Sequence, residues 1–381
     1  MIYDVAVPEV YEDHLVSYYK QDGKYGFILE GNLKQEAVYD RISSGVNGFI
    51  VVKDNKYGIT NQKAEIILSP SFDSIRVFNP YYLIKVKNKY GVLSSSGELI
   101  QKPSFDKIFG VNKYVTVIQD NKGKIKLVLN TTGEIMAGKN IQYVNMYSDV
   151  CIVKSNGLFG VFSDHQIVPF QYDYIDYSIN VNEKKPISGQ VDIFNFNRSA
   201  MPELMVIKDG KLGLINNQGD VIYDAGNDEI KRDSYQPYYT VKKGSLFSIY
   251  FKSAKYATGF DFSKVYTDGA GYVIAVKDGK TGAYNMSGEI VAPFEYDPGG
   301  IFQFSGVGLR VSMNKKMGII ASNGELIIPP IYDDVSMFGL FESRQFVKVS
   351  NDGKSGVVNL KNEILLPLDY EWIDLENDFL K

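Results

Sequence analysis

The sequence is poor in the residues from which most enzyme and metal sites are built. Among 381 residues it has one cysteine, Cys151, and two histidines, His14 and His165. A single cysteine excludes an intrachain disulfide and a zinc site made of four cysteines. The histidines lie 151 positions apart and neither has a metal-ligand spacing beside it. We therefore expect no catalytic residue, no metal site and no cofactor, with Cys151 buried as a small apolar residue and His165 exposed at a turn.

Long apolar runs and a basic stripe are also missing. No stretch reaches the roughly 18 apolar residues of a membrane-spanning helix, so no membrane insertion is expected. The formal net charge of −4 argues against a nucleic-acid partner, which would require a basic surface. The first twenty residues, MIYDVAVPEVYEDHLVSYYK, lack the basic and apolar regions of a secretory signal. These absences together predict a cytoplasmic location.

One phrase recurs along the chain. Residues 87–108, KNKYGVLSSSGELIQKPSFDKI, resemble residues 54–75, DNKYGITNQKAEIILSPSFDSI, and residues 314–335, NKKMGIIASNGELIIPPIYDDV. The anchor of each repeat is the glycine that follows a lysine-aromatic pair in the clearest repeats and a looser version of that pair in the others. The anchors are Gly26, Gly58, Gly91, Gly160, Gly213, Gly282, Gly318 and Gly356, with Leu127 and Ser248 in two degenerate repeats. The spacings are 32, 33, 36, 33, 53, 35, 34, 36 and 38 residues, and a period near 33 to 38 is typical of stacked or radial repeats.

Each repeat reads as a three-stranded antiparallel meander. An alternating strand such as FIVVK (49–53) leads to a two-residue turn such as Asp278-Gly279, which predicts a type I′ hairpin. A second strand contains the anchor glycine, whose recurrence indicates a close backbone approach or an aromatic ring packed over it. A third strand ends near a proline. The aromatic-Asp step that follows, such as Phe72-Asp73, is either an elbow or a short fourth strand. Its aspartate is expected to accept from a backbone N–H two residues on.

The predicted fold is all-β, a tandem array of about ten short meanders. An open superhelical solenoid is favoured because the repeats are shorter than the usual propeller blade and ten exceeds the usual blade number; propeller-like closure is the alternative. Trp372, in the last elbow, is expected to pack as part of an end cap. The predicted divisions are an N-terminal cap (1–19), repeats 1 to 5 (20–176), an insertion loop (177–200), repeats 6 to 10 (201–375) and a C-terminal tail (376–381).

The repeats resemble the WG repeat family of bacteria. The family pattern is an aromatic-Gly pair, a Gly-x-hydrophobic step and a Pro-x-x-aromatic-Asp step. The segments KYGVLSSSGELIQKPSFDKI and MGIIASNGELIIPPIYDDV carry this pattern almost whole, with Met317 in place of the aromatic residue in the second. The resemblance extends over roughly residues 20 to 375. Trp of the family pair is replaced by Tyr or Phe in several repeats and by non-aromatic residues in others. The resemblance implies a β-rich repeat scaffold without assigned catalysis.

The insertion is the one large break in the spacing. Insertions in a repeat array form loops on one face, often the binding face, although a tolerated surface excursion is the alternative. The predicted partner-binding residues are therefore Asp192, Phe194, Phe196 and Arg198. The predicted function is a non-enzymatic scaffold for protein–protein interaction, in bacteria a toxin-neutralising or assembly partner. The alternatives are a carbohydrate or cell-surface binding module, which needs exposed aromatic residues at equivalent positions, and a hydrolase with converging carboxylates of raised pKa.

Overall fold

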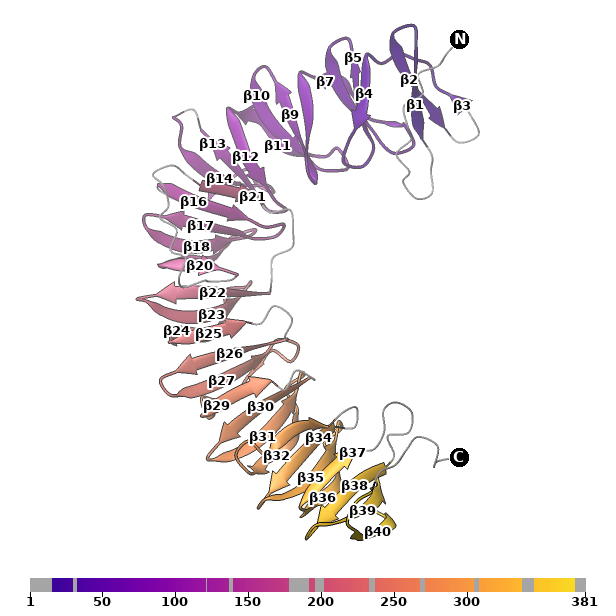
Figure 1. The fold of residues 1–381 in the computed structure, drawn as a ribbon. Helices are drawn as coiled ribbons and strands as arrows, with labels where there is room; N and C mark the ends of the chain where they lie inside the picture. Colours follow the sequence, from indigo (N-terminus) through magenta and orange to yellow (C-terminus); the bar gives the residue numbers. More distant parts are fainter. Residues whose placement is uncertain are drawn as a thin grey trace. The chain divides into compact units, whose positions relative to one another are not determined.

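The computed structural model describes residues 16–29, 33–120, 122–136, 140–177, 192–195, 202–232, 237–267, 271–304, 308–337 and 346–373. Every regular element in these ranges is a β-strand, and the strands form ten sheets (Figure 1). This confirms the all-β array of ten short meanders. The chain divides into two compact units: unit 1 comprises Met1–Gly210 and Leu214–Val221, and unit 2 comprises Lys211–Gly213 and Ile222–Lys381. The sequence-based division at residues 177–200 stays a prediction.

The first twenty strands precede the insertion. They are β1 (Ser17–Gln21), β2 (Lys24–Leu29), β3 (Leu33–Lys34), β4 (Arg41–Ser44), β5 (Phe49–Lys53), β6 (Lys56–Thr60), β7 (Ile66–Phe72), β8 (Ser74–Phe78), β9 (Tyr81–Val86), β10 (Lys89–Leu93), β11 (Leu99–Phe105), β12 (Lys107–Val111), β13 (Val115–Gln119), β14 (Ile125–Leu129), β15 (Ile135–Met136), β16 (Ile141–Met146), β17 (Cys151–Ser155), β18 (Leu158–Phe162), β19 (Gln166–Tyr172) and β20 (Tyr174–Asp176).

Twenty further strands complete the described part of the chain. They are β21 (Asp192–Asn195), β22 (Glu203–Lys208), β23 (Lys211–Asn216), β24 (Val221–Asn227), β25 (Glu229–Arg232), β26 (Tyr238–Lys243), β27 (Leu246–Phe251), β28 (Tyr256–Ala257), β29 (Lys264–Thr267), β30 (Tyr272–Lys277), β31 (Lys280–Asn285), β32 (Ile290–Tyr296), β33 (Ile301–Phe304), β34 (Gly308–Met313), β35 (Lys316–Ala321), β36 (Leu326–Tyr332), β37 (Asp334–Met337), β38 (Phe346–Asn351), β39 (Lys354–Asn359) and β40 (Ile364–Tyr370).

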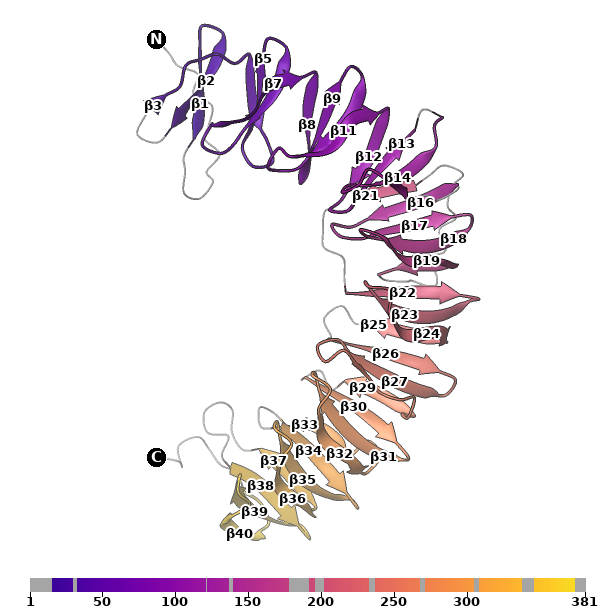
Figure 2. The ribbon, with the colours of Figure 1, turned by 180° about the vertical axis from the view of Figure 1, so that it is seen from behind.

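The aromatic-Asp step does form a fourth strand, but this strand belongs to the next sheet. β8 follows Phe72-Asp73 of one repeat and pairs with β9 of the following repeat, with Ile75 opposite Ile84. The resulting sheet order is β11-β10-β9-β8, and the same offset gives β32-β31-β30-β29 and β40-β39-β38-β37 (Figure 2). Apart from the first sheet, β1-β2-β3, each sheet is thus assembled from two repeats, so neighbouring repeats share backbone hydrogen bonds as well as side-chain packing.

Eight of the first turns have two residues with positive φ, as predicted, whereas only Gly123 in repeat 4 and Gly244 in repeat 7 are found with positive φ among the described residues of those turns. At Asp278-Gly279, φ is 49° and 74°, both in the left-handed region that a type I′ turn requires. Asn314-Lys315 adopts the same conformation without glycine, with φ of 53° and 64°. Asparagine tolerates positive φ better than most residues because its short side chain can bond locally. These tight turns fix the register of β30 against β31 and of β34 against β35.

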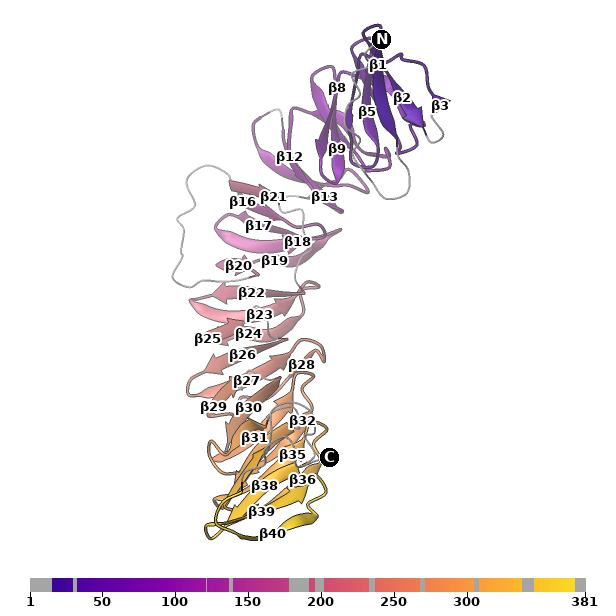
Figure 3. The same cartoon turned by 45° about the vertical axis from the view of Figure 1, so that its right-hand side comes forward.

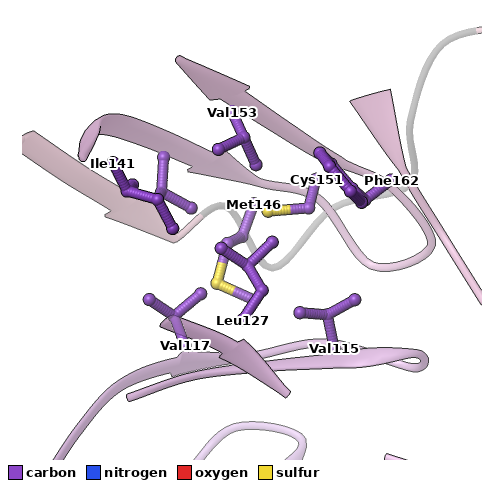
Figure 4. Packing of buried hydrophobic residues seen from close by; sticks show 9 residues of the cluster. Val115, Val117, Leu127, Ile141, Met146, Cys151, Val153 and Phe162 are labelled. Atoms are coloured by element: carbon purple, nitrogen blue, oxygen red, sulfur yellow. The ribbon is translucent and has the colours of Figure 1, made fainter. Parts of the chain in front are cut away.

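The hydrophobic core lies between successive sheets. Met146 of β16 and Cys151 of β17 pack with Val115 of β13 and Leu127 of β14, all nearly fully buried, as Figure 4 shows. Leu127 replaces the anchor glycine in this degenerate repeat and contributes to the core instead. Complete burial of such a side chain stabilises the fold by about 1.5–3 kcal/mol. One meander alone cannot bury both faces, which is why the stacked neighbour is required.

The anchor glycines confirm the predicted close backbone approach. A Cβ atom added at Gly318 would lie 2.4 Å from the carbonyl oxygen of Ile328 and 2.7 Å from the nitrogen of Pro330. At Gly282 the neighbour is instead the ring of Phe294, 2.7 Å from the added atom. In both cases the third strand or its side chain folds across the second strand, so a side chain larger than hydrogen has no room.

The aspartate of the aromatic-Asp step bridges two repeats rather than forming a local Asx-turn. One carboxylate oxygen of Asp73 accepts from Lys56 Nζ at 2.6 Å, and the other accepts from the backbone N–H of Lys87 at 2.7 Å. Lys87 lies in the hairpin turn of the next repeat, 14 residues on. Asp40, Asp228 and Asp333 make the same pair of contacts. The expectation of a bond two residues on was wrong because the following strand carries the chain into the next sheet.

Candidate interaction surface

Two of the four predicted partner-binding residues lie in the part of the chain that the structure describes. Asp192 and Phe194 belong to β21, which pairs in parallel with β16 and places Phe194 opposite Asn145 (Figure 3). Phe196 and Arg198 lie outside the described residues, as does most of the insertion. The role of these four residues in partner binding stays a prediction. What the structure adds is that part of the insertion extends a sheet of its own unit.

Strand β21 shows that one edge of a sheet accepts an added strand. In the sheet order β19-β18-β17-β16-β21, it pairs with the outer edge of β16. β16 is the fourth strand of its sheet, the strand that corresponds to β8 in the sheet β11-β10-β9-β8. Main-chain hydrogen bonds along such an edge are independent of side-chain identity. The opposite edge, formed by third strands such as β32 and β36, carries prolines, Pro293 and Pro329, that lack a donor N–H.

His165 is exposed, as predicted, and lines a shallow cleft of about 320 Å³ in unit 1 with Tyr114, Asp149, Asp164 and Asn217. The pKa of Asp164 is lowered, first by the hydrogen bond from the Ser163 hydroxyl and then by His165. Ser163 donates to Asp164 at 2.8 Å, and His165 Nδ1 lies 2.6 Å from the same oxygen. In a catalytic triad the serine must instead bond the histidine. This cluster therefore lacks triad geometry.

Cys151 is buried, as predicted. Its side chain lies in the core between two sheets, and burial raises the pKa of its thiol. The carboxylates of Asp40, Asp73, Asp228 and Asp333 have pKa values below the ordinary 3.8, chiefly because a lysine donates to each. Within the described ranges, no group of three or more His, Cys, Asp or Glu residues could hold a metal ion. No helix there is long and apolar enough to cross a membrane.

A regular set of exposed aliphatic side chains is the surface feature that sequence reasoning missed. Each follows the acidic residue after the second turn, at the start of the third strand, and each is 47–62% exposed. We call those of unit 1 the unit 1 row and those of unit 2 the unit 2 row. The unit 1 row consists of Ile66, Leu99, Ile135 and Val221; the unit 2 row consists of Ile290, Leu326 and Ile364. Repeats 5 and 7 have Gln166 and Tyr256 at this position.

A glycine contact places neighbouring members of a row beside each other. Gly97, two residues before Leu99, is packed against Ile67, the residue after Ile66: an added Cβ would lie 2.6 Å from Ile67 Cγ2. In unit 2, Gly324 stands in the same relation to Val291, with 3.3 Å to its carbonyl oxygen. In these two pairs, Ile66 with Leu99 and Ile290 with Leu326, the turn that carries the later row member thus rests on the strand that carries the earlier one. Packed sheets are about 10 Å apart, which sets the expected step along the row.

An acidic residue precedes every member of the rows. In the unit 2 row these are Glu289, Glu325 and Glu363, all exposed. Asn285 holds the first of them: its side-chain oxygen accepts from the Glu289 N–H at 3.0 Å, and its amide donates to the Glu289 carboxylate at 2.6 Å. An amide orients a carboxylate without neutralising it. Among the described residues, none of these three glutamates forms an ion pair.

Exposed aromatic side chains do not form a comparable series. Tyr256, Phe302, Tyr370 and Trp372 are the large exposed rings in the described ranges, and they occupy different positions in their repeats. The repeated aromatic platform expected of a carbohydrate-binding module is therefore not formed by these residues. Trp372 is 71% exposed, so the prediction that it packs in an end cap was wrong. It follows β40, the last strand of the described residues.

The fold and the rows define a tandem-repeat β protein with a periodic exposed surface. Residues 57–90 and 317–354 match the family model described as WG containing repeat. The resemblance to the WG repeat family is thus confirmed at these two segments, which include the anchors Gly58 and Gly318. No curated protein matches the chain.

Three solved structures are distantly similar to the chain. A eukaryotic initiation factor is 8% identical, with 92% of this chain and 94% of that chain covered and a TM-score of 0.25. BamB from Moraxella catarrhalis is 12% identical, with 76% and 91% covered and a TM-score of 0.21. The WD40 domain of Pan2 from Neurospora crassa is 10% identical, with 63% and 86% covered and a TM-score of 0.19. Similarity at this level supports no functional conclusion.

Proposed function

We propose that the protein is a non-enzymatic scaffold that binds a protein partner through its exposed rows. The recurrence of exposed Ile, Leu or Val at one position in seven repeats carries this proposal. Single exposed apolar residues are normal on protein surfaces, but a repeated apolar and acidic pair along a stack forms an extended surface. More specifically, the scaffold neutralises a toxin or assists in assembly in a bacterial host. Its expected location is the cytoplasm.

The exposed row side chains contribute little to the stability of the fold and are available for binding a partner. Ile290 is 58% exposed, whereas Val291 and Ala292 beside it are buried. A side chain half in water gains little from folding, and at this position a polar residue would be tolerated equally well. A partner that covered Ile290, Leu326 and Ile364 would gain the remaining apolar burial at about 25 cal/mol per Å² before association costs.

The test is capture from the native host with the full chain as bait, read by mass spectrometry. Three baits are compared: wild type, a row variant with all seven row residues changed to serine, and a control variant with Val77→Ser and Phe302→Ser. Val77 and Phe302 are exposed apolar residues outside the rows, so they match the chemistry of the change. A stoichiometric protein held by wild type and control but lost by the row variant supports the proposal. Equal capture by all three baits contradicts it, and cell fractionation tests the location.

A further inference from the structure

We infer that the unit 2 row is a docking site for a basic amphipathic α-helix of a partner protein. This inference rests on the proposed function and names the chemistry of the partner segment. Three arguments carry it: the step expected between row members from the spacing of packed sheets, the unpaired charge beside each one, and the prolines along the adjacent edge.

The step matches a helix with a seven-residue spacing. Sheets pack about 10 Å apart, and seven residues of α-helix rise about 10.5 Å. A helix with apolar residues at positions i, i+7 and i+14 therefore presents one side chain to each of Ile290, Leu326 and Ile364. Seven residues fall only about 20° short of two full turns, so all three stay on one face of the helix.

The charge beside the row selects a basic segment. Glu289, Glu325 and Glu363 each precede a row member, and none forms an ion pair among the described residues. The second turns around Glu289 and Glu325, NMSGE and ASNGE, contain no lysine or arginine. Lysine or arginine side chains flanking the apolar face of the helix would pair with these carboxylates, and complementary charge raises the association rate and excludes acidic competitors.

The adjacent strand edge disfavours an extended partner. β32, β36 and β40 are the outer strands of their sheets on this side, and they contain Pro293, Pro329 with Pro330, and Pro367. Proline lacks the N–H that a strand ladder requires, so strand addition along this edge loses hydrogen bonds. A helix satisfies its own backbone groups and requires only side-chain contacts, which are what the row offers.

The test uses three synthetic 22-residue peptides and the full chain. The first has leucine at positions 4, 11 and 18, lysine on both flanks of that face and alanine elsewhere. The second has the same composition with leucine every five residues, which scatters the leucines around the helix. The third replaces lysine by glutamate. Fluorescence anisotropy should show the first peptide binding at least about tenfold more tightly than either of the others.

Protein variants locate the site. Leu326→Ser and Glu325→Lys should each weaken binding of the first peptide by about fivefold or more. The matched controls Phe302→Ser and Asp224→Lys change exposed residues of unit 2 outside the row and should leave the affinity unchanged. Equal binding of all three peptides, or binding unaffected by Leu326→Ser, overturns the inference.

The two proposals fail differently. If the row variant loses its natural partner but no helical peptide binds, the helix inference is wrong while the scaffold function stands. If the row variant keeps its partner, the function assigned to the rows is wrong. Peptide binding dependent on Leu326 would then be an artificial affinity and would count against the inference as well.

Discussion

Lys56 Nζ lies 2.6 Å from a carboxylate oxygen of Asp73, across the end of a single repeat. The lysine begins the second strand and the aspartate directly follows the third, while the remaining aspartate oxygen reaches the hairpin turn of the next repeat. This relationship recurs at Asp40, Asp228 and Asp333. At these four points a repeat is thereby fastened to its successor, which fixes the position of the following turn.

The first prediction concerns acid stability. Because Lys56 donates to Asp73, the pKa of Asp73 lies below its ordinary 3.8, and the same holds for Asp333 with Lys316. Such carboxylates stabilise the fold at pH above their ordinary pKa, and this contribution is lost as the pH falls through the lowered values. The urea midpoint should stay constant from pH 7 to about pH 5 and fall below about pH 4. The urea midpoint of the double variant Asp73→Asn with Asp333→Asn should fall less on acidification than that of the wild type. An equal fall would show that these carboxylates do not cause the acid sensitivity.

The second prediction concerns the anchor glycine. Gly318→Ala places a Cβ 2.4 Å from a backbone oxygen that cannot move alone, so we expect a loss of about 1–3 kcal/mol in unfolding free energy. Gly226→Ala is the matched control, because its nearest neighbour would be the flexible end of Lys243 at 3.9 Å. Urea unfolding at neutral pH measures both. A Gly318→Ala variant as stable as the control would show that the close approach is not required.

The third prediction concerns Cys151, which reports on opening of unit 1. Its side chain is fully buried and the pKa of its thiol is raised, so Ellman's reagent should not react with the native protein at pH 8. In denaturant one thiol per chain should react, since the chain has one cysteine. Rapid reaction of the native protein would show that the packing around Met146 and Phe162 opens without global unfolding.

The fourth prediction concerns Trp372, the only tryptophan. At 71% exposure its fluorescence should be quenched by acrylamide almost as strongly in the native as in the unfolded chain. The double variant Ile364→Ser with Leu326→Ser should leave this quenching nearly unchanged. Its free energy of unfolding should differ from that of the wild type by no more than about 0.5 kcal/mol. Strong protection of Trp372 in the isolated protein would restore the predicted end cap.

Local patterns in the sequence were sufficient to predict the strands and first turns. Asp278-Gly279 between alternating runs predicted a type I′ hairpin, and the recurring glycine predicted a close approach such as that of Gly318 to Ile328. The pairing of β8 with β9 was not predictable in this way. Alternation identifies a strand, but it carries no information about which sheet the strand joins.

The rows were missed for a related reason. Ile290 and Ala292 are two residues apart, so alternation would place both on one face, yet the first is 58% exposed and the second is fully buried. The register shifts between the pairs Ala283–Ala292 and Tyr284–Ile290, and this bulge turns Ile290 away from the core. The usable signal was the repeated acidic-aliphatic pair, Glu289-Ile290 and Glu325-Leu326, directly after each second turn.

The most direct test of the account is hydroxyl-radical footprinting of the protein alone and bound to its captured partner, read residue by residue by mass spectrometry. If the partner binds to the rows, binding should reduce the oxidation of Ile290, Leu326 and Ile364, or of the unit 1 row. Val77 and Phe302 should react as before. Protection confined to the cleft around His165 or to β21, with the rows reacting unchanged, would contradict it.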